Sequence, residues 1–480
     1  MSLAAPAYLN SLQSNIRARP IPWDGAVRAG NLTEEQLKKI KSVDKVRKEQ
    51  RKQTIEKDVK NYSNLLVGSG DSGSVFNKAS KRTDILQYIL VLANDLISDA
   101  PELAGSILEH SNPYQHFISF LSQSNNPEDP IPLLSATFLV NLVAYSITAN
   151  SKPQKRDDEA LSKLFSYLST LAKNQDSGLQ DIAVQHYSSL LRTSQSKKIF
   201  WKQKQDTVGP LFDILRKAAG AARDSDSTLR GSGGASSIRS TDTRFAGGVG
   251  LQLVYNILLV IWQLSFEAGF VGEDMEKDEE VIPLYTQLLR VSAKEKTTRL
   301  LLSTLHNLLD ANKEALIPAA TTARLPALLT NLNGRHLSDP DLLEDLEALT
   351  NLLDDYTKNQ TTFDEYADEV NSGHLRWSPP HKNPQFWREN SRKILEDNKG
   401  ALPKKLAEIL GKSWDNDKKV LAIGCNDLGN LVREAPEHRT TLEKLGLKGR
   451  VMELMNDSDE SVRWESLKAV GGWMRYSMEN

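Results

Sequence analysis

The C-terminal part of the chain repeats its own pattern, and this repeat constrains the fold more than any other feature. Residues 406–410 align with residues 451–455 at an offset of 45. In the segments that follow, the offset is 42, and the aligned pairs are Val420 with Val462, Leu428 with Val470, Gly429 with Gly471, and Val432 with Met474. Periods of about 40–47 residues are typical of armadillo and HEAT units, whose stacked helix pairs bury a shared apolar face. The sequence therefore predicts an α-solenoid.

The apolar pattern of the whole chain predicts helices. Apolar residues recur at spacings of three and four, as in Leu301, Leu305 and Leu308, and strand-like alternation is absent. Thr33 and Gln36 have the spacing of a capping box, so a charged helix is expected to begin after Thr33 and to run to about Lys60. We therefore expect an all-α, armadillo/HEAT-like α-solenoid.

The length of the chain, 480 residues, exceeds what one compact core accommodates. We expect a larger N-terminal helical-repeat domain over residues 1–357, a linker at 358–362, and a smaller C-terminal helical-repeat domain over 363–480. The boundary is placed after a long helix expected at Asp341–Tyr356. Segments rich in Gly and Ser near 68–81 and 220–250 are expected to be flexible loops.

Two charged stretches stand out against a balanced background of 60 basic and 62 acidic residues. Residues 339–369 contain eleven acidic residues and one lysine, and the segment 38–60 is basic. Either stretch could steer a partner or be a solvated face. The overall balance argues against a binding protein for nucleic acids or anionic membranes.

The remaining composition predicts a cytoplasmic protein. A single cysteine, Cys425, can form neither an internal disulfide nor a cysteine-based zinc site. The N-terminal segment lacks the apolar core of a signal peptide. The apolar stretches Ile131–Val143 and Leu251–Leu264 are shorter than the ~20 residues of a membrane span, so both are expected to be buried helices.

Motifs for catalysis are incomplete. The segment 68–75 matches the glycine-rich loop of protein kinases, but the lysine, His-Arg-Asp and Asp-Phe-Gly elements that kinases require are missing. Gly411-Lys412-Ser413 ends like a phosphate-binding loop, but Leu406 stands where that loop needs glycine. No histidine pair has the spacing of helical zinc ligands. We therefore expect no catalytic site, no cofactor and no metal.

The loop 411–419 is three residues longer than its counterpart in the next repeat, 456–461. Insertions in repeat proteins collect in loops and often mark binding faces. Two interpretations remain open: a tolerated insertion whose tryptophan folds onto the core, or a partner-binding loop. In the second, the candidate residues are Lys412, Ser413, Trp414, Asp415, Asn416, Asp417, Lys418 and Lys419, with Trp414 as the apolar anchor.

The segment Leu375-Arg376-Trp377-Ser378-Pro379-Pro380-His381, followed by Phe386-Trp387 and Asn390, resembles the H subunit of vacuolar-type (V-type) proton ATPases. The resemblance extends over nearly the whole chain. Because the two prolines interrupt a helix and the aromatic residues flank the break, we expect these signature residues to form a packed corner and to be structural: Trp377, Ser378, Pro379, Pro380, His381, Phe386 and Trp387.

The resemblance implies a regulatory subunit of the soluble head of a proton pump. Such a protein bridges the peripheral stalk, made of the E and G subunits, to the N-terminal cytosolic domain of the membrane a-subunit and supports coupling of ATP hydrolysis to proton transport. In a detached head it inhibits hydrolysis by contacting the B subunit of the catalytic ring and the central rotor. It would be cytoplasmic and would reach vacuolar or endosomal membranes only through the complex. By order along the chain, the loop 411–419 corresponds to the inhibitory loop.

A different armadillo-type binding scaffold is the main alternative. Nuclear import adaptors resemble one another in arrays of tryptophan with asparagine four residues later. Here Trp201 is followed at that spacing by Gln205, Trp262 by Phe266, and Trp464 by Lys468. The array is therefore absent.

Overall fold

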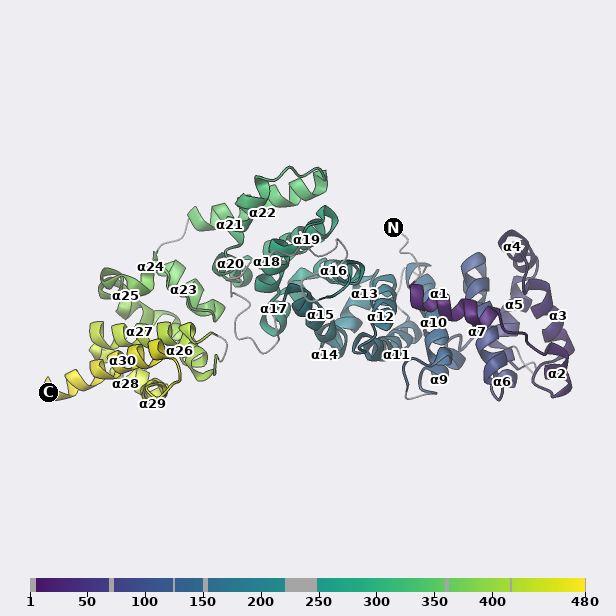
Figure 1. The fold of residues 1–480 in the computed structure, drawn as a ribbon, viewed down its shortest axis with the longest axis horizontal. Coiled ribbons are helices and arrows are strands. Elements are labelled where there is room, and N and C mark those ends of the chain that lie inside the picture. The colour runs from purple at the N-terminus through teal and green to yellow at the C-terminus, as the bar shows by residue number, and fades with distance from the viewer. Residues whose placement is uncertain are drawn as a thin grey trace. The chain divides into compact units, whose positions relative to one another are not determined.

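The computed structural model describes residues 6–68, 73–123, 126–149, 154–220, 248–358, 362–414 and 417–479 (Figure 1). The regular elements of these residues are helices, which confirms the predicted all-α class. The chain divides into two compact units. One comprises the described residues of Met1–Ile214 and Gly250–Glu267, and the other those of Leu215–Val249 and Ala268–Asn480.

The first unit is a series of packed helices. Its helices are α1 (Ala7–Arg17), α2 (Trp23–Arg28), α3 (Glu34–Val43), α4 (Lys48–Glu56), α5 (Val59–Val67), α6 (Val75–Ala79), α7 (Thr83–Asp99), α8 (Glu102–Leu108), α9 (Gln115–Leu121), α10 (Pro130–Ala149), α11 (Lys155–Ala172), α12 (Ser177–Leu190), α13 (Ser194–Lys202), α14 (Lys204–Thr207) and α16 (Leu251–Ser265), together with the first part of α15 (Gly209–Ala219).

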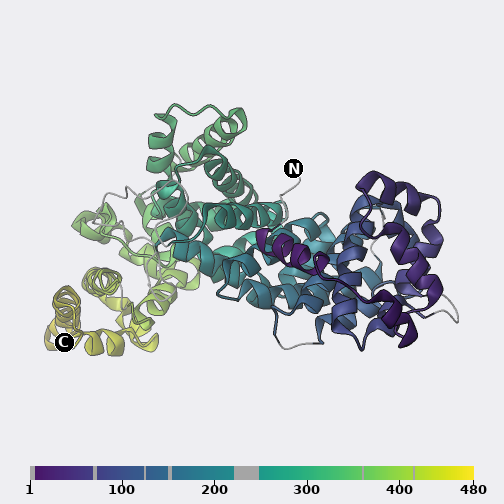
Figure 2. The ribbon, with the colours of Figure 1, turned by 45° about the vertical axis from the view of Figure 1, so that its right-hand side comes forward.

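The long helices of this unit pack on one another in chain order, α7 on α10, α10 on α11, α11 on α12 and α12 on α16. The N-terminal helix α1, purple in Figure 2, instead contacts both α7 and α12. Helix α10 is long and apolar enough to cross a membrane by length and composition, but 72% of its most apolar window is buried. Its packing against α7, α9 and α11 accounts for that composition.

Two predictions for this unit require correction. Thr33 does form the capping box, but the helix that it begins ends at Val43, and α4 and α5 follow as separate helices. Asp44 is extended and Lys45 has a φ of 54°, which interrupts the helical backbone. Within the expected loop 68–81, the helix α6 forms because Val75 and Phe76 are fully buried. Residues 69–72 of that loop lie outside the described residues.

The second unit contains the rest of α15 and fourteen further α-helices over its described residues. They are α17 (Ala268–Glu279), α18 (Val281–Val291), α19 (Glu295–Ala311), α20 (Lys313–Thr322), α21 (Leu325–Asn333), α22 (Pro340–Lys358), α23 (Thr362–Ser372), α24 (Pro379–Lys382), α25 (Pro384–Glu396), α26 (Ala401–Gly411), α27 (Lys419–Glu434), α28 (Arg439–Lys444), α29 (Leu447–Leu454) and α30 (Glu460–Glu479), with 3-10 turns at Asp397–Lys399 and Pro436–His438.

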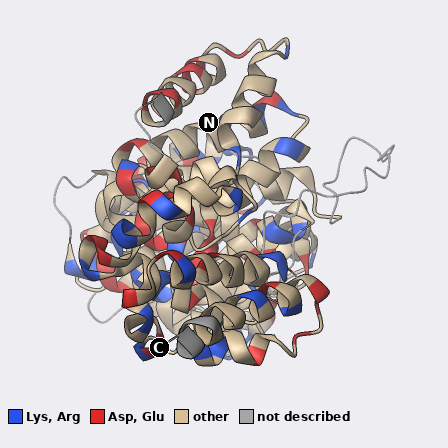
Figure 3. Cartoon of the chain, turned by 90° about the vertical axis from the view of Figure 1, so that its left-hand side faces the viewer, with Lys and Arg blue, Asp and Glu red and all other residues tan. Residues whose placement is uncertain are grey.

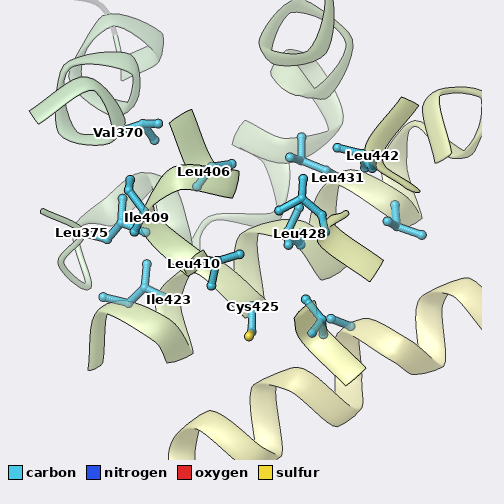
Figure 4. Close-up of a cluster of buried hydrophobic side chains, with 14 of the residues drawn as sticks. Val370, Leu375, Leu406, Ile409, Leu410, Ile423, Cys425, Leu428, Leu431 and Leu442 are labelled. Atoms are coloured by element: carbon cyan, nitrogen blue, oxygen red, sulfur yellow. The ribbon is translucent and has the colours of Figure 1, made fainter. Parts of the chain in front are cut away.

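The core of the C-terminal repeats is formed by the apolar faces of α26 and α27. Leu406, Ile409 and Leu410 of α26 belong to one buried cluster with Leu428 and Leu431 of α27 (Figure 4). Helix α30 packs along α27, and α29 packs on α26. The second helix pair therefore stacks on the first, as the offsets of 45 and 42 residues predict.

The expected linker at 358–362 lies largely outside the described residues, as does most of the expected loop at 220–250. The domain boundary at 358–362 therefore stays a prediction. Helix α22, expected at Asp341–Tyr356, spans Pro340–Lys358. Some of its acidic residues are paired, since Arg299 contacts Asp341 and His306 lies 3.3 Å from Asp345. Acidic and basic residues are interspersed over the helices (Figure 3).

Candidate partner-binding site in the C-terminal repeats

The loop between α26 and α27 is held to the core by Trp414. Its side chain is 1% exposed, and its indole Nε1 donates a hydrogen bond to the carbonyl of Ile409 at 2.7 Å. The ring of His374 packs edge-on at 5.6 Å. Trp414 has a φ of 51°, in the left-handed region that costs a non-glycine residue roughly 1–2 kcal/mol. Burial of the indole offsets this cost.

The first residues of the loop are held by hydrogen bonds from the next repeat. Arg450 of α29 donates from Nε to the carbonyl of Leu410 at 2.7 Å and from its guanidinium to the carbonyl of Lys412 at 3.4 Å. These carbonyls lie at the C-terminal end of α26, where the helix itself supplies no donors. The inserted loop therefore begins from a fixed point.

The polar residues of the loop differ in how far they are engaged. Lys412, Ser413 and Lys419 are exposed. Lys418 is half-buried and pairs with Asp457 at 3.1 Å. Asp417 donates its backbone N–H to the carbonyl of Trp414 at 3.0 Å. Asp415 and Asn416 lie outside the described residues.

Trp414, the proposed apolar anchor, is thus buried, whereas several residues of the proposed polar rim are exposed. Trp414 lies in the core, as in the first of the two interpretations left open by the sequence. The exposed side chains that the loop offers to a partner include Lys412 and Lys419. While Trp414 remains buried, Lys412, Ser413 and Lys419 offer a partner polar contacts, two of them through basic groups.

The signature segment 375–387 forms a corner between helices. The chain leaves α23 at Ser372, continues without regular structure, and begins α24 with Pro379 and Pro380 at its first positions, where a missing N–H carries no cost. Phe386 and Trp387 are 3% and 1% exposed and pack against Tyr366. Phe386 and Trp387 therefore lie in a packed corner, and the structural role expected for the segment stays a prediction.

Trp377, in the same segment, is 36% exposed. The N–H of Ser378 bonds to the carbonyl of Arg376 at 2.7 Å, which closes a three-residue turn with Trp377 at its apex. Trp377 is thus more exposed than Phe386 and Trp387, and its structural role stays a prediction. The ammonium of Lys382 lies over its ring at 5.7 Å.

His381 joins the corner to α23 and α27 through two carboxylates. Its Nδ1 lies 2.8 Å from Asp427 and its Nε2 lies 3.1 Å from Glu369. Carboxylates accept hydrogen bonds, so both ring nitrogens donate and the ring is an imidazolium. Burial alone lowers the pKa of a histidine, but Asp427 and Glu369 outweigh burial and raise the pKa of His381 to about 10.

The two carboxylates also order the backbone around them. Glu369 accepts from the hydroxyl of Ser378 at 2.7 Å and from the N–H of Arg376. Asn426 donates to Asp427 at 3.3 Å and to the carbonyl of His381 at 3.0 Å. These bonds hold the segment between α23 and α24 against two helices and engage both ring nitrogens of His381, while the ring of Tyr366 packs against the imidazolium at 5.5 Å.

A second contact between a histidine and a carboxylate joins the segment after α23 to the junction of α17 and α18. Nε2 of His374 lies 3.3 Å from the carboxylate of Glu280. Glu280 has a φ of 50° and precedes α18, while Glu276 accepts from the N–H of Ile282 at 2.8 Å. Helix α20 also packs against α23. The C-terminal repeats are thus in contact with α17–α20 within the second unit.

Glu369, Asp427 and Glu280 were not identified from the sequence. Glu369 is the last acid of the stretch 339–369, and nothing in the sequence distinguishes it from the other ten. Asp427 offered a usable signal, since it precedes Leu428 on the apolar side of a helix, where an acid requires a partner. In the described part of the chain, no group of three or more His, Cys, Asp and Glu side chains could hold a metal ion.

The stacked helix pairs, the inserted loop and the polar corner define a helical-repeat protein of the armadillo/HEAT type. A family model for the N-terminal part of the V-ATPase H subunit matches residues 7–353, and its C-terminal counterpart matches residues 359–478. Because these models cover most of the chain, the chain belongs to the family of V-ATPase H subunits.

Relatives of the chain agree with this assignment. It is 29% identical over 485 aligned positions to the H subunit of the V-type proton ATPase of Drosophila melanogaster, covering 99% of this chain and 92% of the relative. It is 28% identical to the H subunit of Dictyostelium discoideum, covering 87% of this chain and 84% of the relative. Among solved structures, a designed armadillo repeat protein is 14% identical, has a TM-score of 0.39, and is matched over 62% of this chain and all of its own length.

Proposed function

We propose that this chain is a non-catalytic regulatory subunit of the soluble head of a V-type proton-pumping ATPase. It bridges the peripheral stalk, made of the E and G subunits, to the N-terminal cytosolic domain of the membrane a-subunit, and it supports ATP-driven proton transport. In a detached head it inhibits ATP hydrolysis by contacting the B subunit of the catalytic ring and the central rotor. It is cytoplasmic and lies at vacuolar or endosomal membranes through the complex.

The observation that carries the proposal is the match of both family models, in order, over nearly the whole chain. The loop 412–419 supports the inhibitory part, because its exposed lysines stand on a base fixed by Trp414 and Arg450. A rigid base lowers the entropy lost when a loop binds a partner. Two helical domains joined near residue 358 would provide the two arrangements that a switch requires.

The proposal is tested by ATP hydrolysis. Detached catalytic heads that lack this protein are assayed with magnesium before and after the purified chain is added, and binding is measured in parallel. We expect a clear fall in turnover. Binding without inhibition would leave a structural bridge, and no binding would leave the alternative function, an armadillo-type scaffold for other proteins.

The role of the loop requires variants that keep the fold. Replacing the whole loop would remove Trp414 from the core, so the exposed lysines are changed instead, as Lys412→Glu with Lys419→Glu. Lys404→Glu, at an exposed position of α26, is the matched control. We expect the double variant to inhibit ATP hydrolysis by the head at least tenfold more weakly than the unmodified chain. The control should inhibit as strongly as the unmodified chain. Equal inhibition by all three proteins would remove the loop from the mechanism.

A further inference from the structure

The last helix, α30, carries an apolar stripe on the side that faces away from the core. Trp464, Leu467 and Met474 are 61%, 52% and 56% exposed. Together with Gly471 they are spaced by three, four and three residues, which places them on one face of the helix. The opposite face, with Val462, Ala469 and Trp473, is buried in the core of the C-terminal repeats.

The repeat shows what normally covers such a stripe. At the offset of 42 residues, the four stripe positions correspond to four residues of α27: Ala422, Cys425, Gly429 and Val432. Ala422, Cys425 and Val432 are at most 2% exposed. Helix α30 lies on this side of α27, since Val432 lies 3.7 Å from the Cβ position of Gly472. In the first repeat, the residues equivalent to the stripe are therefore buried by the helix of the next repeat.

Gly429 of α27 and Gly471 of α30 are equivalent in the repeat, and only Gly429 is covered by another helix. A Cβ on Gly429 would lie 3.2 Å from the Cα of Ala469, so the absence of a side chain lets α30 approach α27 closely. A Cβ on Gly471 would meet nothing within 4 Å. Gly471 thus leaves room for an equally close approach by another helix.

The borders of the stripe are charged. Arg463 and Lys468 are exposed and lie on either side of it by helical periodicity. Lys468 pairs with the half-buried Glu465 at 2.8 Å, and Arg463 donates to the carbonyls of Asp457 and Ser458 at 2.8 Å. Both cationic groups remain accessible to an acidic partner.

We propose that this stripe is the docking site for one α-helix of another protein, which stacks on α30 as α30 stacks on α27. The partner helix carries a small residue opposite Gly471, in the role of Ala469. It places apolar side chains against Trp464 and Met474, and acidic residues opposite Arg463 and Lys468. This inference does not depend on the proposed function, because it rests on the register of the repeat.

The test uses the full chain and a synthetic 20-residue helical peptide. The peptide keeps the core-facing residues of α30, namely Val462, Ser466, Ala469, Val470 and Trp473, and has glutamate at its borders. Binding is measured by fluorescence anisotropy. We expect saturable binding that weakens at least tenfold in Leu467→Asp and Gly471→Leu chains and in a peptide with leucine at the Ala469 position. Leu343→Asp, which changes another exposed leucine, is the control and should bind normally.

Three results would overturn the proposal. The peptide could fail to bind, or it could bind the Leu467→Asp and Gly471→Leu chains as well as the unmodified chain. Alternatively, sedimentation could reveal a dimer of the unmodified chain that Leu467→Asp dissociates, in which case a second copy of this chain covers the stripe. Thermal melting of each variant establishes that a loss of binding is not a loss of folding.

Discussion

The imidazolium of His381 allows a prediction that separates its charge from its size. Because Asp427 is fully buried and Glu369 nearly so, replacing His381 by asparagine leaves two buried carboxylates without a cation. Loss of one partner from a buried ionic group costs about 3–5 kcal/mol. We therefore expect the free energy that opposes local opening of α24 and α27 at pH 7 to be about 3–5 kcal/mol lower in the His381→Asn chain.

The pH dependence has a definite sign. The pKa of His381 is raised from 6.5 to about 10, so its stabilisation is complete below pH 6.5 and is lost as the pH rises toward 10. Between pH 7 and 9, the difference between the unmodified and His381→Asn chains should shrink by about 1.4 kcal/mol per pH unit. Hydrogen exchange of α24 and α27 amides in the full chain measures this, after correction for intrinsic rates.

His306 supplies the control for this experiment. It lies 3.3 Å from Asp345 but is one-third exposed, so His306→Asn should change stability by less than about 1 kcal/mol. A difference between the unmodified and His381→Asn chains that stays constant from pH 7 to 9 would refute the charged state of His381. An equal effect of both substitutions would refute the importance of burial.

Three further predictions concern packing and chemistry. Trp414→Ala should destabilise the C-terminal repeats by about 3–5 kcal/mol, measured by local hydrogen exchange, and unchanged protection of α26 would contradict the packing described for the loop. Gly429→Ala should destabilise by about 1–3 kcal/mol because its Cβ meets Ala469, whereas Gly471→Ala should stabilise by about 1 kcal/mol; the two melting temperatures should therefore move in opposite directions. Calorimetry with magnesium and ATP should detect no binding to the isolated chain, and saturable binding would reopen the glycine-rich segment 68–75 as a nucleotide site.

Much of the fold follows from periodicity in the sequence. The offset between Leu428 and Val470 identified a stacked repeat, since both residues must face a core that only neighbouring helices provide. The break after Val43 was missed because it depends on a left-handed residue, Lys45, whose side chain gives no sign of its backbone angle. The short helix α6 was missed because Val75 and Phe76 gain stability from distant helices, which outweighs the glycines before them.

The candidate site was less predictable. The extra residues of the loop showed in the alignment of the repeat, but the direction of Trp414 did not, since a tryptophan among polar residues can anchor either a loop or a partner. The pairing of His381 with Asp427 spans 46 positions and joins different helices, so spacing along the chain carries no trace of it. Such constellations depend on how helices stack, and that geometry is fixed by tertiary packing.

Cys425 gives the protein a built-in chemical reporter. It is the single cysteine of the chain, it is fully buried, and burial raises the pKa of its thiol to about 12. A protonated and inaccessible thiol does not react with alkylating reagents, so labelling requires the helices around it to separate. The rate of labelling in the unmodified chain therefore measures how often the helices around Cys425 separate. A slower rate after a partner is added would show that the partner stabilises this repeat, and a faster rate that it destabilises it, without any introduced probe.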